Sequence, residues 1–236
     1  MSPVNTKGLR PLPRAWRVIK RVLIILFLLQ LLYILLLKWV NPPITLTQVG
    51  SLIEGDGLHR TYVSMKDISP YAKLAVISTE DQLFPDHDGF DFKNIEKAMK
   101  HNQKSKSLHG ASTISQQVAK NVFLWQGRSW FRKGLEVYFT FMIEMIWGKR
   151  RILEMYLNVA EMGKGIYGIE AAARNYYHIP AKELTRLEAA RIAACLPNPK
   201  IYTVKPLSDH VATRAAWAIG QMSHLQEDPD IQKLVQ

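Results

Sequence analysis

The stretch "SPYAKLAVISTEDQLFPDHDGFD", Ser69 to Asp91, joins an apolar helical pattern to an acidic loop. A Ser-Pro start signal and apolar residues at helical spacing predict a helix that runs to its two adjacent acids, Glu80 and Asp81. Neighbouring helix residues point ~100° apart, so the two acids are not expected to face one site or to share a proton. Whichever acid lies away from the apolar lead-in faces the cleft.

The loop that follows these acids carries one histidine and several aspartates. Phe84, His87 and Gly89 are interpreted as loop scaffolding. A zinc site would have to use the polar residues of the loop, Asp86, His87, Asp88 and Asp91. Because no second histidine stands at ligand spacing, and hydrated Asp-rich loops are common, the zinc interpretation is disfavoured.

A second helix is predicted over "ASTISQQVAKNVFL", Ala111 to Leu124. Its polar and apolar residues separate at a spacing of four, because such positions share one helix face. The polar stripe holds Ser112, Gln116 and Lys120, widened by Thr113 and Gln117, and the opposite stripe holds Ile114, Val118 and Val122. We expect the apolar stripe to pack inward.

The polar stripe offers a hydroxyl, two amides and an ammonium along ~12 Å of helix. That arrangement suits a long polar ligand with an anionic group near Lys120. The alternative is an ordinary solvated face. Against it, most of the stripe consists of short or amide side chains rather than the long charged ones typical of such faces.

The segment "GRSWFRKGLE", Gly127 to Glu136, places Arg128, Arg132 and Glu136 at helical spacing. Arg132 and Glu136 alone would make a surface ion pair worth a few tenths of a kcal/mol. However, the apolar run "VYFTFMI" follows Glu136, so this carboxylate is expected to be partly desolvated and to need a partner or a task.

Aromatic residues flank the same segment: Phe123, Trp125, Trp130 and Phe131. By default they belong to the core. In a membrane-tethered domain they would instead dip into the bilayer surface, where tryptophan is favoured.

The run "VLIILFLLQLLYILLLKWV", Val22 to Val40, predicts a transmembrane helix. A cleaved signal peptide would have a shorter apolar region and a small-residue cleavage site. A buried core helix would not be apolar on every face beside a basic cluster. Since Lys/Arg flanks stay cytoplasmic, we expect a cytoplasmic N-terminus and a single-pass anchor that carries one extracytoplasmic domain.

Charge and cysteine usage agree with a tethered domain. The formal net charge is +11, but six basic residues precede residue 22 and the rest of the chain has 25 basic against 20 acidic residues. The excess is therefore largely a property of the tail, which disfavours nucleic-acid binding. The single cysteine, Cys195, excludes an intramolecular disulfide and is interpreted as a small buried hydrophobe rather than a catalytic thiol.

The chain therefore divides into a basic cytoplasmic tail (1–21), a transmembrane helix (22–40), a linker (41–61) and one domain (62–236). Strand signals are few, so the domain is predicted to be mainly α. Further helices are expected over 130–162, with a break near Gly148, and over 165–177, 185–196 and 208–225.

Four motifs resemble the successive signatures of family 51 peptidoglycan glycosyltransferases. They are "EDQLFPDHDGFD" from Glu80, "GASTISQQVAKN" from Gly110, "RKGLE" from Arg132 and "KRRILEMYLNVAEMGKGIYGIEAAARNYY" from Lys149. The resemblance runs from about Tyr62 to about Pro199 in the family's order and spacing. With a chain end at Gln236, a penicillin-binding transpeptidase domain has no room, so the chain resembles the monofunctional members from Gram-negative inner membranes.

The resemblance implies a mainly α, lysozyme-like domain with a large lobe and a small membrane-facing jaw lobe, to which the aromatics would belong. It makes Glu80 the general base and Glu136 a second essential glutamate. Lys120 and Arg128 match ligands of the donor pyrophosphate, and Ser112, Gln117 and Arg132 match residues that line the donor site. Residues implied to support the site are Asp81, Phe84, His87, Gly89, Thr113, Gln116, Asn121 and Lys133. Glu154 and Asn158 are expected to hold the lobe together.

The implied reaction transfers a growing lipid-linked glycan from undecaprenyl diphosphate to the GlcNAc 4-hydroxyl of lipid II, forming β-1,4 links with inversion. No cofactor is required, although a divalent cation, Mg or Mn, would suit the donor pyrophosphate. Implied partners are lipid II, the nascent strand, the membrane, penicillin-binding proteins and division proteins. Two alternatives remain: a lytic transglycosylase, which has no pyrophosphate to neutralise, and a non-catalytic scaffold of the division machinery.

Overall fold

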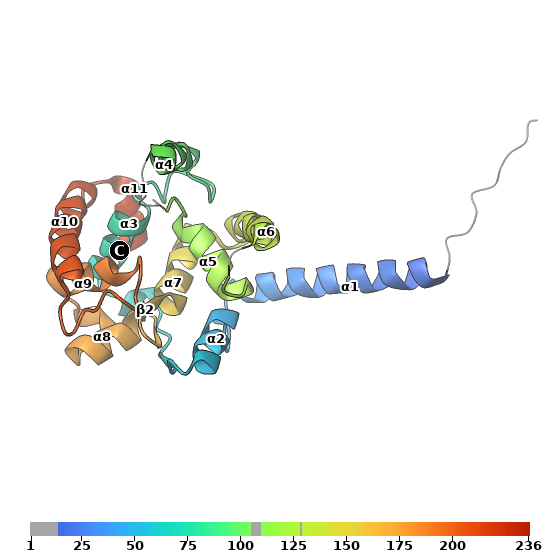
Figure 1. Ribbon diagram of the computed structural model, residues 1–236, viewed down its shortest axis with the longest axis horizontal. Helices are drawn as coiled ribbons and strands as arrows, with labels where there is room; N and C mark the ends of the chain where they lie inside the picture. The colour runs from blue at the N-terminus through green and yellow to red at the C-terminus, as the bar shows by residue number, and fades with distance from the viewer. Residues whose placement is uncertain (1–13, 105–109, 128) are drawn as a thin grey trace, which may run out of the picture.

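The computed structural model describes residues 14–104, 110–127 and 129–236, and these residues are mainly helical (Figure 1). The mainly α prediction is therefore confirmed. The helices are α1 (Arg14–Leu36), α2 (Leu46–Glu54), α3 (Pro70–Glu80), α4 (Phe92–Lys104), α5 (Ile114–Phe123), α6 (Trp130–Trp147), α7 (Lys149–Val159), α8 (Ile169–Tyr177), α9 (Arg186–Cys195), α10 (Asp209–Leu225) and α11 (Pro229–Val235). Two short 3-10 turns cover Met65–Asp67 and Ala181–Glu183.

Helix α3 lies at the centre of the domain and carries the first acid at its C-terminal end. Its residues from Ala72 to Ser78 are all buried, and it packs against α9, α10 and α11. Helix α5 packs against α6 and α7 on the side of the domain nearest to α1 (Figure 1). The end of α3 therefore lies between the two helix groups.

Local sequence signals set several helix ends as expected. The Ser69 hydroxyl accepts a hydrogen bond from the backbone of Tyr71 and Pro70 occupies the first turn, so α3 starts at the predicted signal. The predicted break near Gly148 is also confirmed, because α6 ends at Trp147 and α7 starts at Lys149. Gly148 has φ 78°, a left-handed value that favours glycine.

Three helices, α2, α4 and α11, and a small sheet were not predicted. Helix α2 lies inside the expected linker, where Thr45 and Gln48 form a capping box and Gly55 ends the helix in the left-handed conformation. Helix α4 follows the acidic loop. The sheet has the order β1-β3-β2, in which β1 (His59–Arg60) runs parallel to β3 (Ile166–Tyr167) and β2 (Glu161–Gly163) runs antiparallel to it.

Helix α1 projects away from the domain (Figure 1), and its segment Ala15–Leu36 is long and apolar enough to cross a membrane. The helix ends at Leu36, four residues before the end of the predicted apolar run. The turn that follows is held by the guanidinium of Arg151, which donates to the carbonyl oxygens of Leu37 (2.9 Å) and Val40 (3.0 Å). The end of α1 is thereby fixed to the start of α7.

Candidate active site

The carboxylate of Glu80 is held from α5. Gln117 donates its Nε2–H to Oε2 of Glu80 at 2.8 Å, and the hydroxyl of Tyr156 on α7 donates to Oε1 of Gln117 at 3.2 Å. Because the tyrosine donates to the amide oxygen, the amide nitrogen is left facing the carboxylate. Three helices therefore meet at Glu80 through two consecutive hydrogen bonds.

Burial raises the pKa of the Glu80 carboxyl above its ordinary value, and the Gln117 hydrogen bond together with the charges of Arg214 and Lys120 opposes that rise. Arg214 comes from α10, which packs against α3. Neither Tyr156 nor Arg214 was predicted as part of the site. Tyr156 lies within the quoted "ILEMYLN" segment, but Arg214 lies beyond the motifs and had no sequence signal.

Asp81 lies just outside α3, with an extended φ of −162°, so the ~100° separation expected for two helix residues does not apply. Both acids line one cavity, which corrects the expectation that they face different sites. The Asp81 carboxylate accepts the backbone N–H of Ile114 at 2.9 Å and lies 2.9 Å from Nε2 of His87. It therefore ties the end of α3 to the loop and to the start of α5.

The loop is packed closely against α6. Gly89 has φ 88°, and a Cβ there would lie 2.8 Å from Cγ2 of Thr140 and 2.9 Å from Cγ of Glu144. Its carbonyl accepts the Thr113 hydroxyl at 2.7 Å. Only glycine fits this position, which brings the loop, α5 and α6 together. Phe84, in the same loop, is fully buried.

The ring nitrogens of His87 are both engaged. Nδ1 accepts the Gly89 N–H at 3.1 Å, which leaves Nε2 to donate to Asp81. Among residues 14–104, 110–127 and 129–236, no group of three or more His, Cys, Asp or Glu side chains that could hold a metal ion is found. The geometry therefore does not favour the zinc interpretation of this loop.

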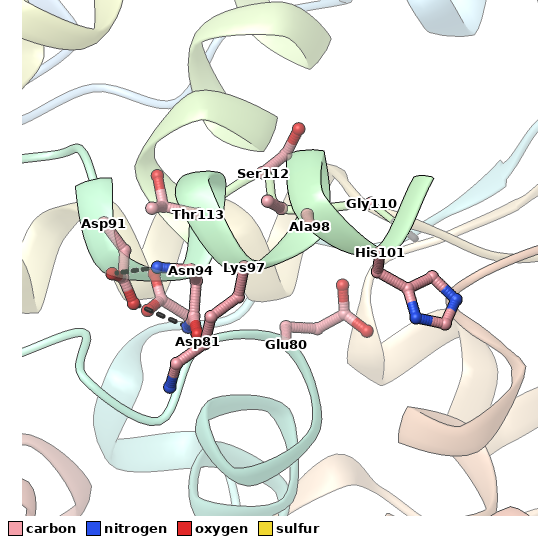
Figure 2. Close-up of a pocket in the computed structure, with 11 residues that line it drawn as sticks. Glu80, Asp81, Asp91, Asn94, Lys97, Ala98, His101, Gly110, Ser112 and Thr113 are labelled. Carbon is pink, nitrogen blue, oxygen red and sulfur yellow. Dashed lines mark hydrogen bonds between the residues drawn. The ribbon is translucent and has the colours of Figure 1, made fainter. Parts of the chain in front are cut away.

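A cavity of about 370 Å³ opens in front of the two acids. Figure 2 shows that it lies between the end of α3, helix α4 and the segment before α5. Helix α4 supplies Asn94, Lys97 and His101, none of which was predicted, and Ser112 also lines the cavity. The missed signal is Asp91, whose Oδ1 accepts the Asn94 N–H at 2.9 Å as an N-cap does.

The predicted polar stripe of α5 is only partly formed. Ser112 precedes the helix, because Thr113 is its N-cap and Gln116 folds back to close the capping box, where it is buried. Of the residues predicted for the stripe, only Gln117 and Lys120 line a second cavity, which has a volume of about 190 Å³. The inward packing of the opposite stripe is confirmed, because Ile114, Val118 and Val122 are all buried. Asn121, at the end of α5, is also buried.

Charged side chains of α5 and α6 form a cluster. Glu136 is 3% exposed, and its oxygens accept hydrogen bonds from Lys133 at 2.6 Å and from Arg132 at 3.2 Å. Burial lowers the pKa of the Lys120 ammonium, which Glu136 and Glu80 counteract. The predicted need of Glu136 for a partner is met by two cations. Arg128 lies outside the described residues.

Three other residues that the sequence predicts to be structural, Glu154, Asn158 and Cys195, have contacts or burial typical of that role. Glu154 accepts the Met65 N–H at 3.2 Å and Asn158 accepts the Val63 N–H at 2.8 Å, so both join α7 to the segment before α3. Cys195 is fully buried, and burial raises its pKa to about 12. The thiol is therefore protonated at neutral pH, as expected for a core residue.

The aromatics divide between core and surface. Phe123 stacks on Phe139 with ring centroids 4.6 Å apart. Trp130 and Phe131, at the start of α6, are 92% and 71% exposed, so they are not core residues. Trp125 is also exposed.

Comparison with known proteins places these features in context. A family model described as transglycosylase matches residues 47–223. A biosynthetic peptidoglycan transglycosylase of Shigella boydii is 47% identical over 224 residues, which cover 88% of this chain and 93% of that protein. A protein of the same name from Mannheimia succiniciproducens is 58% identical over 70% of this chain and 67% of its own length. Another from Escherichia coli is 54% identical over 74% of this chain and 73% of its own length.

Proposed function

Because the chain belongs to the transglycosylase family of peptidoglycan glycosyltransferases, we propose that it polymerises glycan strands from lipid II, with Glu80 as the general base. The observation that carries this assignment is the Gln117–Glu80 hydrogen bond of 2.8 Å, which fixes a carboxylate of raised pKa at the wall of a cavity. The acceptor is the GlcNAc 4-hydroxyl of lipid II.

A sugar hydroxyl is a poor nucleophile at neutral pH, so its proton must leave as the new C–O bond forms. A carboxylate whose pKa is raised toward the working pH is suited to accept that proton. Gln117 aims the Glu80 oxygen, and Tyr156 holds Gln117 in the required orientation. Substrate that enters the 370 Å³ cavity would meet this carboxylate directly.

The leaving group is undecaprenyl diphosphate, which gains negative charge as the bond to C1 breaks. It therefore needs cations more than a proton. Lys120 is near enough to Glu80 and to Arg132 for both charges to act on its pKa. We assign Lys120 and Arg128 to the donor diphosphate, as the motifs predict, and add Arg132, which the motifs place in the lining of the donor site. Ser112 and Gln117 would line the donor sugar path.

Attack on C1 opposite the diphosphate converts an α link into a β-1,4 link, so the reaction inverts the anomeric centre. No covalent glycosyl-enzyme intermediate is needed, in contrast to retaining glycosidases. Glu136 would orient Arg132 and Lys133 instead of acting as a nucleophile, since both of its oxygens already accept from these cations.

The protein side chains do not fit a resident divalent cation. Cations already occupy both oxygens of Glu136, and the other donor-site side chains in the described part of the chain are a hydroxyl, an amide and an ammonium or guanidinium group. Any divalent cation would have to be carried by the diphosphate of the substrate, and none of the steps above depends on one.

Helix α1 anchors the enzyme in the inner membrane. Its basic N-terminal end supports a cytoplasmic N-terminus and a periplasmic catalytic domain, because Lys/Arg flanks remain inside. In this orientation the active site meets lipid II on the outer face of the membrane, where the growing strand is needed.

The test is polymerisation of lipid II by the purified full chain, with and without a divalent cation. The wild-type protein should produce glycan strands, and Glu80→Gln should bind donor without forming product. Robust synthesis by Glu80→Gln would remove the assigned base. Soluble fragments from finished sacculus, without polymer from lipid II, would instead identify a lytic enzyme.

A further inference from the structure

Helix α2 turns its uncharged polar side chains inward and its leucine and isoleucine side chains outward, and Glu54 at its C-terminal end is also exposed. Thr47, Gln48 and Ser51 are no more than 6% exposed, whereas Leu52 and Ile53 are 50% and 81% exposed. Leu46 is also 50% exposed. A helix on a water-facing surface shows the opposite arrangement, with its apolar stripe toward the core.

Hydrogen bonds fix this orientation. The Thr47 hydroxyl donates to the carbonyl of Asn121 at 3.3 Å, and the Ser51 hydroxyl donates to the carbonyl of Gly57 at 2.8 Å. Arg60 donates to Oε1 of Gln48 at 3.2 Å. Rotation of α2 to bury its leucines would break these bonds, so its apolar face stays outward.

The end of α5 places α2 at the level of the spanning helix. Asn121 contacts α2, and the Phe123 ring two residues later lies 6.2 Å from the ring of Tyr33. Two helix residues rise only about 3 Å. Tyr33 belongs to the membrane-spanning segment Ala15–Leu36, so α2 lies near the depth at which α1 meets the domain (Figure 1).

The connection between α1 and α2 is also apolar and exposed. Trp39 is 70% exposed, Val40 59% and Ile44 37%. Exposed apolar side chains therefore recur along the chain from the spanning helix to Ile53. A partner that covers α2 must also be compatible with the lipid that surrounds α1.

Positive charge gathers where α1 enters the domain. An open cavity of about 460 Å³ there is lined by Trp39, Trp147 and four basic residues, Lys38, Lys66, Arg150 and Arg151. Lys38 lies over the Trp39 ring at 5.6 Å. Tryptophan and basic side chains favour the headgroup level of a membrane, where they meet phosphates.

We propose that α2 lies in the plane of the membrane interface as a second anchor, with Leu46, Leu52 and Ile53 in contact with phospholipid. The occupant of this face is the outer leaflet of the bilayer that α1 crosses, and the inference rests on the proposed anchoring by α1. A lone spanning helix leaves the domain free to tilt relative to the membrane plane. Contact through α2 limits that tilt and holds the active site at one height above the bilayer.

The test uses the full chain in vesicles of phosphatidylethanolamine and phosphatidylglycerol. A bimane fluorophore is attached at Ile53→Cys or, as a second site, at Leu52→Cys. Quenching is measured with aqueous iodide and with lipids spin-labelled near the headgroup or, for the position on α1, along the acyl chain. Leu29→Cys on α1 reports insertion of the anchor. Ala216→Cys, exposed on α10, is the water-facing control. The native Cys195 is buried, and wild type taken through the same labelling reaction measures its background.

Positions 52, 53 and 29 should be quenched by the labelled lipid, and position 216 by iodide alone. Iodide quenching at 53 with lipid quenching at 29 would overturn the inference while leaving the anchor intact. Shielding of 53 from both quenchers would indicate a protein partner, including a second copy, and would also overturn it. Absence of lipid quenching at 29 would refute the anchor and this inference together.

Discussion

Nε2 of Gln117 lies 2.8 Å from Oε2 of Glu80, and this contact joins two residues that are 37 positions apart in the chain and belong to different helices. Each residue comes from a different motif. The Tyr156 hydroxyl, from a third motif, donates to the other end of the same amide. The orientation of the proposed base therefore depends on side chains from three separate segments.

Tyr156→Phe should slow polymerisation and shift its pH dependence. The variant removes one neutral hydrogen bond, which is worth about 0.5–1.5 kcal/mol, or roughly a 2–10-fold loss in kcat. A less well-held Gln117 lowers the Glu80 pKa less effectively, so the acidic limb of the kcat profile should move to higher pH. Steady-state kinetics from pH 5 to 9 measure both effects.

Tyr176→Phe is the matched control. It removes another buried hydroxyl, which donates to the Met162 carbonyl at 2.9 Å away from the site. It should change stability without moving the acidic limb. If the two variants share one pH profile, Tyr156 does not position the base.

Glu80→Gln should make the protein more stable at alkaline pH. Burial raises the pKa of the folded carboxyl above its ordinary value of 4.5, so the folded state binds more protons than the unfolded state between the two values. Stability contributed by the protonated form is present below the unfolded pKa and is lost as pH rises through the folded pKa. The variant avoids that loss.

Thermal unfolding in detergent should show a higher Tm for Glu80→Gln at pH 8, with the difference shrinking toward pH 4. In a domain of this size 1 kcal/mol corresponds to roughly 2–4 °C. Glu96→Gln, at an exposed position on α4, should show no such pH-dependent gain. A Tm difference that is equal at both pH values would contradict the proposed ionisation of Glu80.

Asp81→Ala should destabilise the fold without removing the base. It leaves the Ile114 N–H and the His87 ring without their acceptor. Each buried unsatisfied group lowers the stability of the fold by about 1–3 kcal/mol. Asp86→Ala, in the same loop but exposed, is the control. Equal Tm values for the two variants would show that Asp81 does not hold the helix end.

The sequence predicted the helices whose ends carry local signals, such as the Ser-Pro start of α3 and the Gly148 break. It missed α2 because Pro42-Pro43 and three glycines are typical of a linker, while the capping box of Thr45 and Gln48 was not used. Helical periodicity alone placed Gln116 on an open face, although its amide closes the start of α5. Side-chain capping thus overrode the pattern.

The site was predictable where family motifs carry it and less so elsewhere. Gln117 was expected to line the donor site, but its contact with Glu80 depends on how α3 and α5 cross, which spacing does not define. Arg214 acts on Glu80 through charge from α10. Such a long-range partner leaves no periodic signal in its own segment.

Glu136→Gln should make donor binding fail at lower pH than in the wild type. Burial and the charges of Arg132 and Lys133 lower the pKa of the Lys120 ammonium, and Glu136 is the main charge that opposes them. Without that carboxylate, Lys120 loses its proton earlier as pH rises, so the diphosphate loses a cation. Binding of a phosphoglycolipid donor analogue, measured from pH 7 to 10, should therefore weaken at lower pH in the variant.

A Lys120→Arg change in the Glu136→Gln background is the control, because a guanidinium stays protonated throughout this range. The double variant should bind the analogue with little dependence on pH, even if its affinity is lower overall. If Glu136→Gln instead reduces affinity by the same factor at every pH, Glu136 acts only through the geometry of Arg132 and Lys133. The charge coupling between Glu136 and Lys120 would then play no part in donor binding.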